Sequence, residues 1–144
     1  MPGHSWPLAE QPEHFELGCI LSSAAIDLVE PVAVGTLSVQ HAGLWECNLA
    51  DNSLVWSGGV FDIFGLPRGA VVSREEAVRF YAEDSRAAME RLRSHAIRAR
   101  CGFTIDVEIT PAVGTRRSMR LIGAPVCDPE SGEVMRLHGL KLII

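Results

Sequence analysis

The sequence predicts an α+β domain in which two short strands precede a group of helices and three longer strands follow it. Three observations indicate this order. Two short apolar segments flank a polar turn at residues 51–53, helical spacing dominates residues 73–100, and strict alternation of apolar and polar residues begins at Phe103. A change of hydrophobic period from 3.6 to 2 marks the passage from helix to strand. At 144 residues, the chain is long enough for one core.

Residues 1–41 are expected to form an N-terminal region that precedes the compact domain at 42–144. Residues 1–12 contain three prolines and predict a loose tail, and residues 32–39 predict an extended linker or an extra strand. Between them, residues 13–29 predict a helix that Pro31 ends. Its apolar residues recur at helical spacing on one face, which we expect to be a homodimer interface. That face consists of Leu17, Ile20, Leu21, Ala24 and Leu28.

The compact domain is expected to open with a hairpin and a short helix. Residues 43–49 and 54–56 predict strands, and Asp51-Asn52-Ser53 supplies the turn. A short helix over residues 59–64 is expected to follow.

Two further helices are predicted by their caps. Ser73 and Glu76 form a capping box that starts a helix through about Tyr81. Asp84 is expected to cap the longest helix, over residues 85–100, whose apolar stripe faces the core. The arginines that recur every seven residues on this helix are expected to face solvent; they are Arg86, Arg93 and Arg100.

The last part of the chain predicts three strands, at residues 103–109, 116–126 and 135–144. Asp106 and Glu108 alternate with apolar residues, so they are expected to face solvent. Gly123 indicates an irregularity in the second of these strands. The final strand is nearly all apolar at its end, which is typical of a central strand.

Composition excludes several classes of function. The formal charge is 13 − 18 = −5, which argues against nucleic-acid binding and against an anionic membrane surface as partner. No apolar run reaches the length of a membrane span and the N-terminus lacks the pattern of a signal peptide, so a cytoplasmic location is expected. The four cysteines form no C-x-x-C pair and are interpreted as cytosolic thiols that mostly fill the core.

The segments Gly43-Leu-Trp-Glu46, Trp56-Ser57 and Ile63-Phe-Gly-Leu-Pro67, with Glu83-Asp84 before the long helix, resemble PAS sensor domains. The resemblance covers about Ala42 to Ile143. It implies a PAS-like five-stranded antiparallel sheet, with the helices inserted between strands 2 and 3 and an apolar pocket between the two layers. It further implies a bacterial signal-transduction module without catalysis of its own, which forms a homodimer and acts on a downstream signalling protein.

A set of aromatic, sulfur-containing and aliphatic residues is expected to line the ligand pocket, because small-molecule sites are mostly apolar. The predicted set is Trp56, Phe61, Phe64, Met89, Leu92, His95, Phe103, Ile105, Met119 and Leu121. The sequence contains no nucleophile elbow, P-loop or dinucleotide motif, so no catalytic residue and no metal ligand is predicted.

The identity of the ligand stays open. Haem-binding relatives use a histidine on the long helix, and His95 lies there, although at the edge of the apolar stripe; His138 is a second candidate. The Asn-Cys-Arg-Phe motif of the flavin-binding relatives is absent, which argues against flavin.

Two alternatives remain at this point. One is a dimerisation module that binds no ligand. The other is a small cone-shaped enzyme or carrier similar to ketosteroid isomerase, which needs an acid or base inside its pocket. A buried carboxylate, or Tyr81, lining the main cavity would favour the second alternative.

Overall fold

The structure, a computed structural model, describes residues 14–15, 18–21 and 41–144. In these residues the elements are, in chain order, β1 (His14–Phe15), β2 (Gly18–Leu21), β3 (Ala42–Asn48), β4 (Leu54–Trp56), α2 (Gly58–Phe64), α3 (Arg74–Val78), α4 (Glu83–Ala99), β5 (Gly102–Ile109), β6 (Arg117–Cys127) and β7 (Val134–Ile143).

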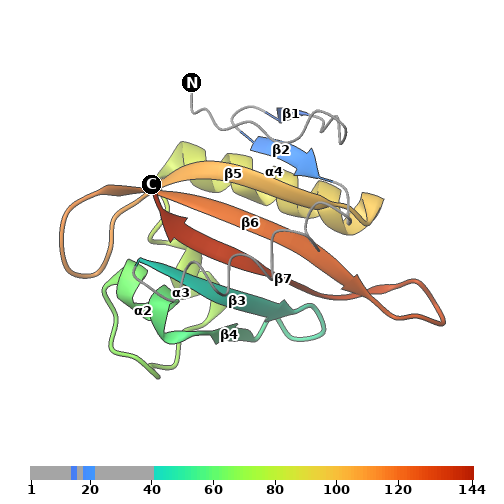
Figure 1. Cartoon of the computed structure of the whole chain (residues 1–144), viewed down its shortest axis with the longest axis horizontal. Coiled ribbons are helices and arrows are strands. Elements are labelled where there is room, and N and C mark those ends of the chain that lie inside the picture. Colours follow the sequence, from blue (N-terminus) through green and yellow to red (C-terminus); the bar gives the residue numbers. More distant parts are fainter. Residues whose placement is uncertain (1–13, 16–17, 22–40) are drawn as a thin grey trace.

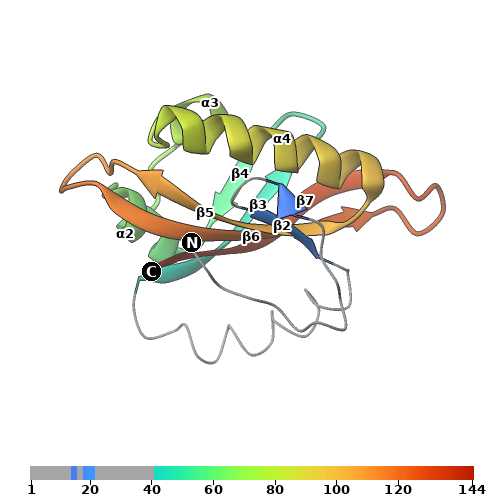
Figure 2. The ribbon, with the colours of Figure 1, turned by 90° about the horizontal axis from the view of Figure 1, so that it is seen from above.

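The strands form one antiparallel sheet, in the order β1-β2-β5-β6-β7-β3-β4 (Figure 1). Helices α3 and α4 lie on one face of it, as the view in Figure 2 shows. The predicted succession of two strands, helices and three strands is confirmed. So is the central place of the last strand, because β7 lies between β6 and β3. None of the described helices has both the length and the apolar character that a membrane crossing needs.

The prediction of an N-terminal helix is wrong for the part of it that the structure describes. His14–Phe15 and Gly18–Leu21 are strands, and β2 pairs with the edge of β5, where Gly18 lies opposite Ile105. The edge of a sheet offers unpaired backbone groups, and pairing with them outweighs the weak helix propensity of a segment that contains Gly18. The predicted helical dimer face therefore does not exist at Ile20 and Leu21. Its other members, Leu17, Ala24 and Leu28, lie outside the described residues.

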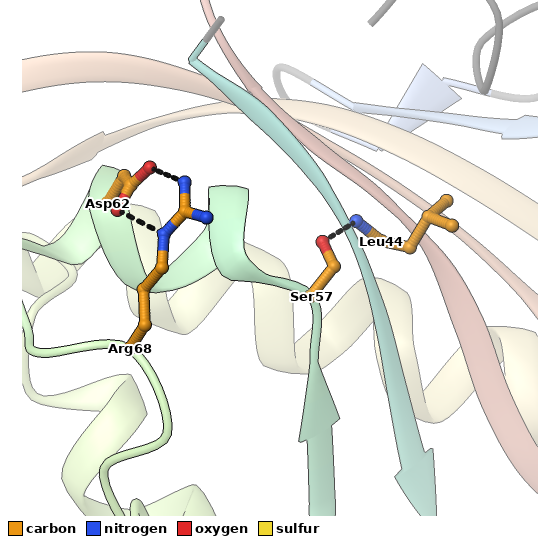
Figure 3. Close-up of polar contacts among 4 residues, drawn as sticks. All are labelled: Leu44, Ser57, Asp62 and Arg68. Carbon is orange, nitrogen blue, oxygen red and sulfur yellow. Dashed lines mark hydrogen bonds and ion pairs between the residues drawn. The ribbon is translucent and has the colours of Figure 1, made fainter. Parts of the chain in front are cut away.

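Ser57 fixes the start of α2 to the neighbouring strand β3 (Figure 3). Its hydroxyl accepts a hydrogen bond from the backbone N–H of Leu44 at 2.9 Å, and its own N–H donates to the Leu44 carbonyl, also at 2.9 Å. At the other end of α2, Arg68 binds both carboxylate oxygens of Asp62, at 2.5 and 3.1 Å. The Trp-Ser motif thus joins a hairpin strand to the first helix through a side chain.

The capping box at Ser73 and Glu76 is confirmed, and α3 ends at Val78. The prediction of Asp84 as the cap of the long helix is wrong. The N-cap is Ala82, which has no side-chain capping bond, and Asp84 lies in the first turn. The reason is tertiary, because the Ala82 N–H donates to the Glu108 carbonyl and the Glu108 N–H donates to the Ser85 hydroxyl.

Gly123 makes room for an aromatic ring at the centre of the sheet. Gly139 lies between Trp45 on β3 and Gly123 on β6 in the register. The Trp45 indole donates to the Ile122 carbonyl at 3.1 Å, and a Cβ on Gly123 would lie 2.9 Å from its ring. The predicted irregularity at Gly123 is wrong, since the register shifts instead between Val126 and Cys127.

Candidate functional site

A cavity of about 50 Å³ lies between the sheet and helices α3 and α4. Its apolar wall comes from both layers and includes Trp45, Trp56, Met89, Phe103, Leu121 and Leu137. Its polar groups are Cys47, Arg74, Tyr81, Arg93 and Lys141. An apolar wall with a few convergent polar groups is the usual composition of a small-molecule site.

The predicted pocket residues divide into two groups. Trp56, Met89, Phe103 and Leu121 line this cavity. The other six do not line it. Phe61, Phe64, Leu92, Ile105 and Met119 are buried core side chains, and His95 is half-buried on α4. Contact between any of these ten residues and a ligand stays a prediction.

Lys141 is the most unusual side chain of the cavity, and sequence reasoning missed it. It is only 7% exposed, and its Nζ donates a hydrogen bond to the Tyr81 hydroxyl at 2.8 Å. The rings of Trp45, Phe64 and Tyr81 lie around the same nitrogen, with centroids 5.2–5.5 Å away. A signal for it exists in the sequence: one lysine stands inside the apolar run of the last strand, two positions after Gly139 and four after Leu137. With period 2, these positions share the face toward the helices.

Burial changes the proton affinity of both partners in this pair. Removal from water lowers the pKa of Lys141 to about 7; the charge of Arg74 acts in the same direction, and Cys47 opposes it. Burial also raises the pKa of the Tyr81 phenol, with a smaller opposing effect from Arg74 and a further raising effect from Glu90. In each case the apolar surroundings disfavour the charged form.

The two arginines of the cavity differ in their partners. Arg74 forms an ion pair with Glu90 on α4 and is 20% exposed. Arg93 is half-buried and donates to the Asn52 side-chain carbonyl at 3.3 Å, so the expectation that it simply faces solvent is wrong. The cavity is therefore lined by three cationic residues, and no Asp or Glu of the described chain is among its lining residues.

The acidic residues of β5 point away from the cavity. Asp106 alternates with the core residues Ile105 and Val107, so its side chain lies on the opposite face of the sheet. It is only 9% exposed, and Arg120 donates to both of its oxygens at 2.7 and 3.0 Å. The expectation that Asp106 faces solvent is therefore wrong, whereas Glu108 is 45% exposed.

Neither candidate histidine lines the cavity. His138 alternates with Leu137 and Gly139 on β7, so it points to the opposite face, and His95 is absent from the lining. Sites for drug-sized ligands have volumes of roughly 300–1,000 Å³, well above the volume of this cavity. The residues present do not fit haem. The described chain also contains no group of three His, Cys, Asp or Glu side chains placed to hold a metal ion.

Comparison with known proteins places the fold. No family model matches the chain, and no curated protein matches its sequence. Solved structures do match. The N-terminal domain of a diguanylate cyclase with a PAS/PAC sensor from Marinobacter aquaeolei has 18% identity and a TM-score of 0.64, over 71% of this chain and 94% of that one. A domain of a light and redox sensing histidine kinase described as putative, from Haloarcula marismortui, has 15% identity and a TM-score of 0.64, over 79% and 98%.

A third similar structure, a sensory box histidine kinase/response regulator from Burkholderia thailandensis, has 18% identity and a TM-score of 0.61, over 81% of this chain and 84% of that one. At these identities the likeness establishes the fold. The alternative of a cone-shaped fold similar to ketosteroid isomerase therefore loses its support. Tyr81, whose presence in the cavity was expected to favour that alternative, does line the cavity.

Proposed function

We propose that this chain, which has the PAS fold, is a sensory module of signal transduction that binds a small ligand in the cavity beneath α3 and α4. The observation that carries the proposal is the cavity itself, which has an aromatic wall and a few polar groups drawn from both layers of the domain. PAS-fold neighbours in a diguanylate cyclase and in histidine kinases support a role in signalling.

The proposed mechanism is a shift between two packings of the helices on the sheet. Lys141 belongs to the central strand β7, and Tyr81 belongs to the junction between α3 and α4. A ligand that contacts both of these side chains interacts with both layers at once. If it binds one packing more tightly than the other, it shifts the population toward that packing, and the sheet carries the change to a partner. The downstream protein, the homodimer and the cytoplasmic location stay predictions.

The test of ligand binding compares the wild-type protein with one that has a filled cavity. Ala77 lines the cavity from α3, and Ala77→Leu adds three carbon atoms there. Ala87, on the exposed side of α4, gives the matched control Ala87→Leu. Denaturing mass spectrometry of protein purified from cells, with an absorption spectrum, should find a small molecule with the wild type and with Ala87→Leu.

The Ala77→Leu protein should lose that molecule. A wild-type protein that carries no molecule and gains no thermal stability from any added metabolite would contradict the sensor proposal. It would favour the module that acts by protein contact alone.

A further inference from the structure

The Lys141 ammonium is short of hydrogen-bond partners. An ammonium group has three N–H donors. The structure gives Lys141 one hydrogen bond, to the Tyr81 hydroxyl, and no ion pair within the described chain. A buried charge without a counter-ion is costly, and the group then favours its neutral form. The cavity therefore contains a donor group that lacks an anion.

The charged groups that face Lys141 strengthen this conclusion. From α3, Arg74 adds positive charge, which Glu90 on α4 balances through its ion pair. Also from α4, Arg93 adds positive charge, and it donates a hydrogen bond to the neutral amide of Asn52. From β3, Cys47 is the remaining titratable group of the cavity. Two cations thus remain without a carboxylate partner in the described residues.

The size of the cavity limits the ligand. One water molecule needs roughly 10–15 Å³ of cavity volume. The cavity of about 50 Å³ therefore holds a molecule of a few heavy atoms. The apolar wall of Trp45, Phe103 and Leu137 favours a short apolar group beside the charged one. A carboxylate with two or three carbon atoms meets both conditions.

We propose that Lys141 and the Tyr81 hydroxyl bind the carboxylate of a short organic acid, which supplies the missing counter-ion. This inference rests on the proposed sensor function and names its ligand class. The carboxylate oxygens accept from Lys141 Nζ, and the Tyr81 hydroxyl donates to one of them. The carbon chain of the acid packs against the aromatic wall.

Binding should take up a proton. The free protein has Lys141 with a pKa near 7, because burial disfavours the ammonium. A bound carboxylate favours the ammonium and raises this pKa. At pH 8 the Lys141 amine of the free protein is mostly neutral. The protein should therefore take up about 0.9 proton from the buffer for each carboxylate that binds. The dissociation constant should be nearly constant between the range in which the free acid is protonated and pH 7, and above pH 7 it should rise by up to about tenfold per pH unit.

Calorimetry on the full chain with sodium acetate, formate and propionate tests the inference, in two buffers of different ionisation enthalpy. Sodium chloride controls for ionic strength, and acetamide is the neutral counterpart of acetate. Acetate should bind to the wild type with proton uptake at pH 8, and acetamide should bind at least tenfold more weakly. Lys141→Met should abolish acetate binding. Arg68→Met, which removes an exposed positive charge paired with Asp62, should leave it unchanged.

Three results would overturn the inference: equal binding of acetate and acetamide, acetate binding without proton uptake, or the same affinity in Lys141→Met. The proton count needs only the wild type, so a variant that fails to fold does not block the test. A neutral molecule that occupies the cavity would leave the sensor proposal standing and refute the carboxylate. Failure of every molecule to bind would refute both.

Discussion

At the scale of single residues, the unusual feature of this domain is a lysine placed in its core. Lys141 is surrounded by Trp45, Phe64 and Tyr81, at distances suited to cation–π attraction. This attraction and one hydrogen bond compensate only part of the loss of hydration. The group therefore lowers the stability of the folded state while it is protonated.

The pH dependence of stability should report this cost. The unfolded lysine has a pKa of about 10.4, and the folded one has a pKa near 7. Between these values the unfolded state binds more protons, so the free energy of unfolding should rise with pH. The expected rise from Lys141 is up to about 1.4 kcal/mol per pH unit. Below pH 7 both states are protonated, and the contribution to the slope disappears.

Urea unfolding at pH 7, 8 and 9, in a buffer without carboxylate or phosphate, measures this slope. Lys141→Met should lack the rise, whereas Arg68→Met, at an exposed ion pair, should keep it. Parallel profiles for the wild type and Lys141→Met would show that the lysine has an ordinary pKa in the folded protein.

At the scale of elements, the contact between α2 and β3 depends on close approach of two backbones. Ser57 makes two hydrogen bonds to Leu44 at this contact. A Cβ on Gly59 would lie 1.8 Å from the Ala42 carbonyl oxygen, so the strand and the helix would have to separate. The three atoms nearest to a Cβ on Gly58 would all belong to the flexible guanidinium of Arg68. Two adjacent glycines of one helix thus have different roles.

Substitution of these two glycines should separate the roles. Gly59→Ala should lower the free energy of unfolding by about 2 kcal/mol or more, because it forces backbone displacement. Gly58→Ala is the matched control and should change stability by less than about 0.5 kcal/mol, since alanine also has the better helix propensity. Denaturant unfolding followed by circular dichroism compares them. Equal changes in the free energy of unfolding would mean that α2 and β3 can move apart at little cost.

At the scale of the whole molecule, the two faces of the sheet differ. Trp45, Cys47, Leu54 and Trp56 line the cavity, so Leu44 and Val55, which alternate with them, lie on the other face. There Leu44 is 38% and Val55 63% exposed. Exposed apolar side chains on a sheet face make it a candidate contact surface. This face is therefore the place to test the predicted homodimer.

Leu44→Asp should raise the dissociation constant of a homodimer at least about tenfold, because burial of one leucine contributes roughly 1.5–3 kcal/mol. Val71→Asp is the control, since Val71 is 97% exposed in a loop between α2 and α3. Light scattering across a dilution series measures the mass. A wild-type protein that stays monomeric, or a Leu44→Asp protein that keeps the wild-type mass, would contradict this interface.

The sequence by itself determined the features that local chemistry controls. Period 2 and period 3.6 gave the order of strands and helices, the capping box gave the start of α3, and the apolar run gave the central strand β7. These signals are read within a few residues of the chain. Four members of the cavity wall could be predicted for the same reason, since Trp56, Met89, Phe103 and Leu121 belong to the core-facing pattern.

Only the tertiary structure decided the features that depend on partners far apart in the sequence. The edge of β5 made a strand of Gly18–Leu21, and the backbone of Glu108 set the start of α4 at Glu83 rather than after Asp84. Tyr81 and Lys141, 60 residues apart, become a hydrogen-bonded pair only when the α3–α4 junction packs on β7. Local propensity carries no information on which edge is unpaired or which side chains meet across two layers, because long-range packing selects both.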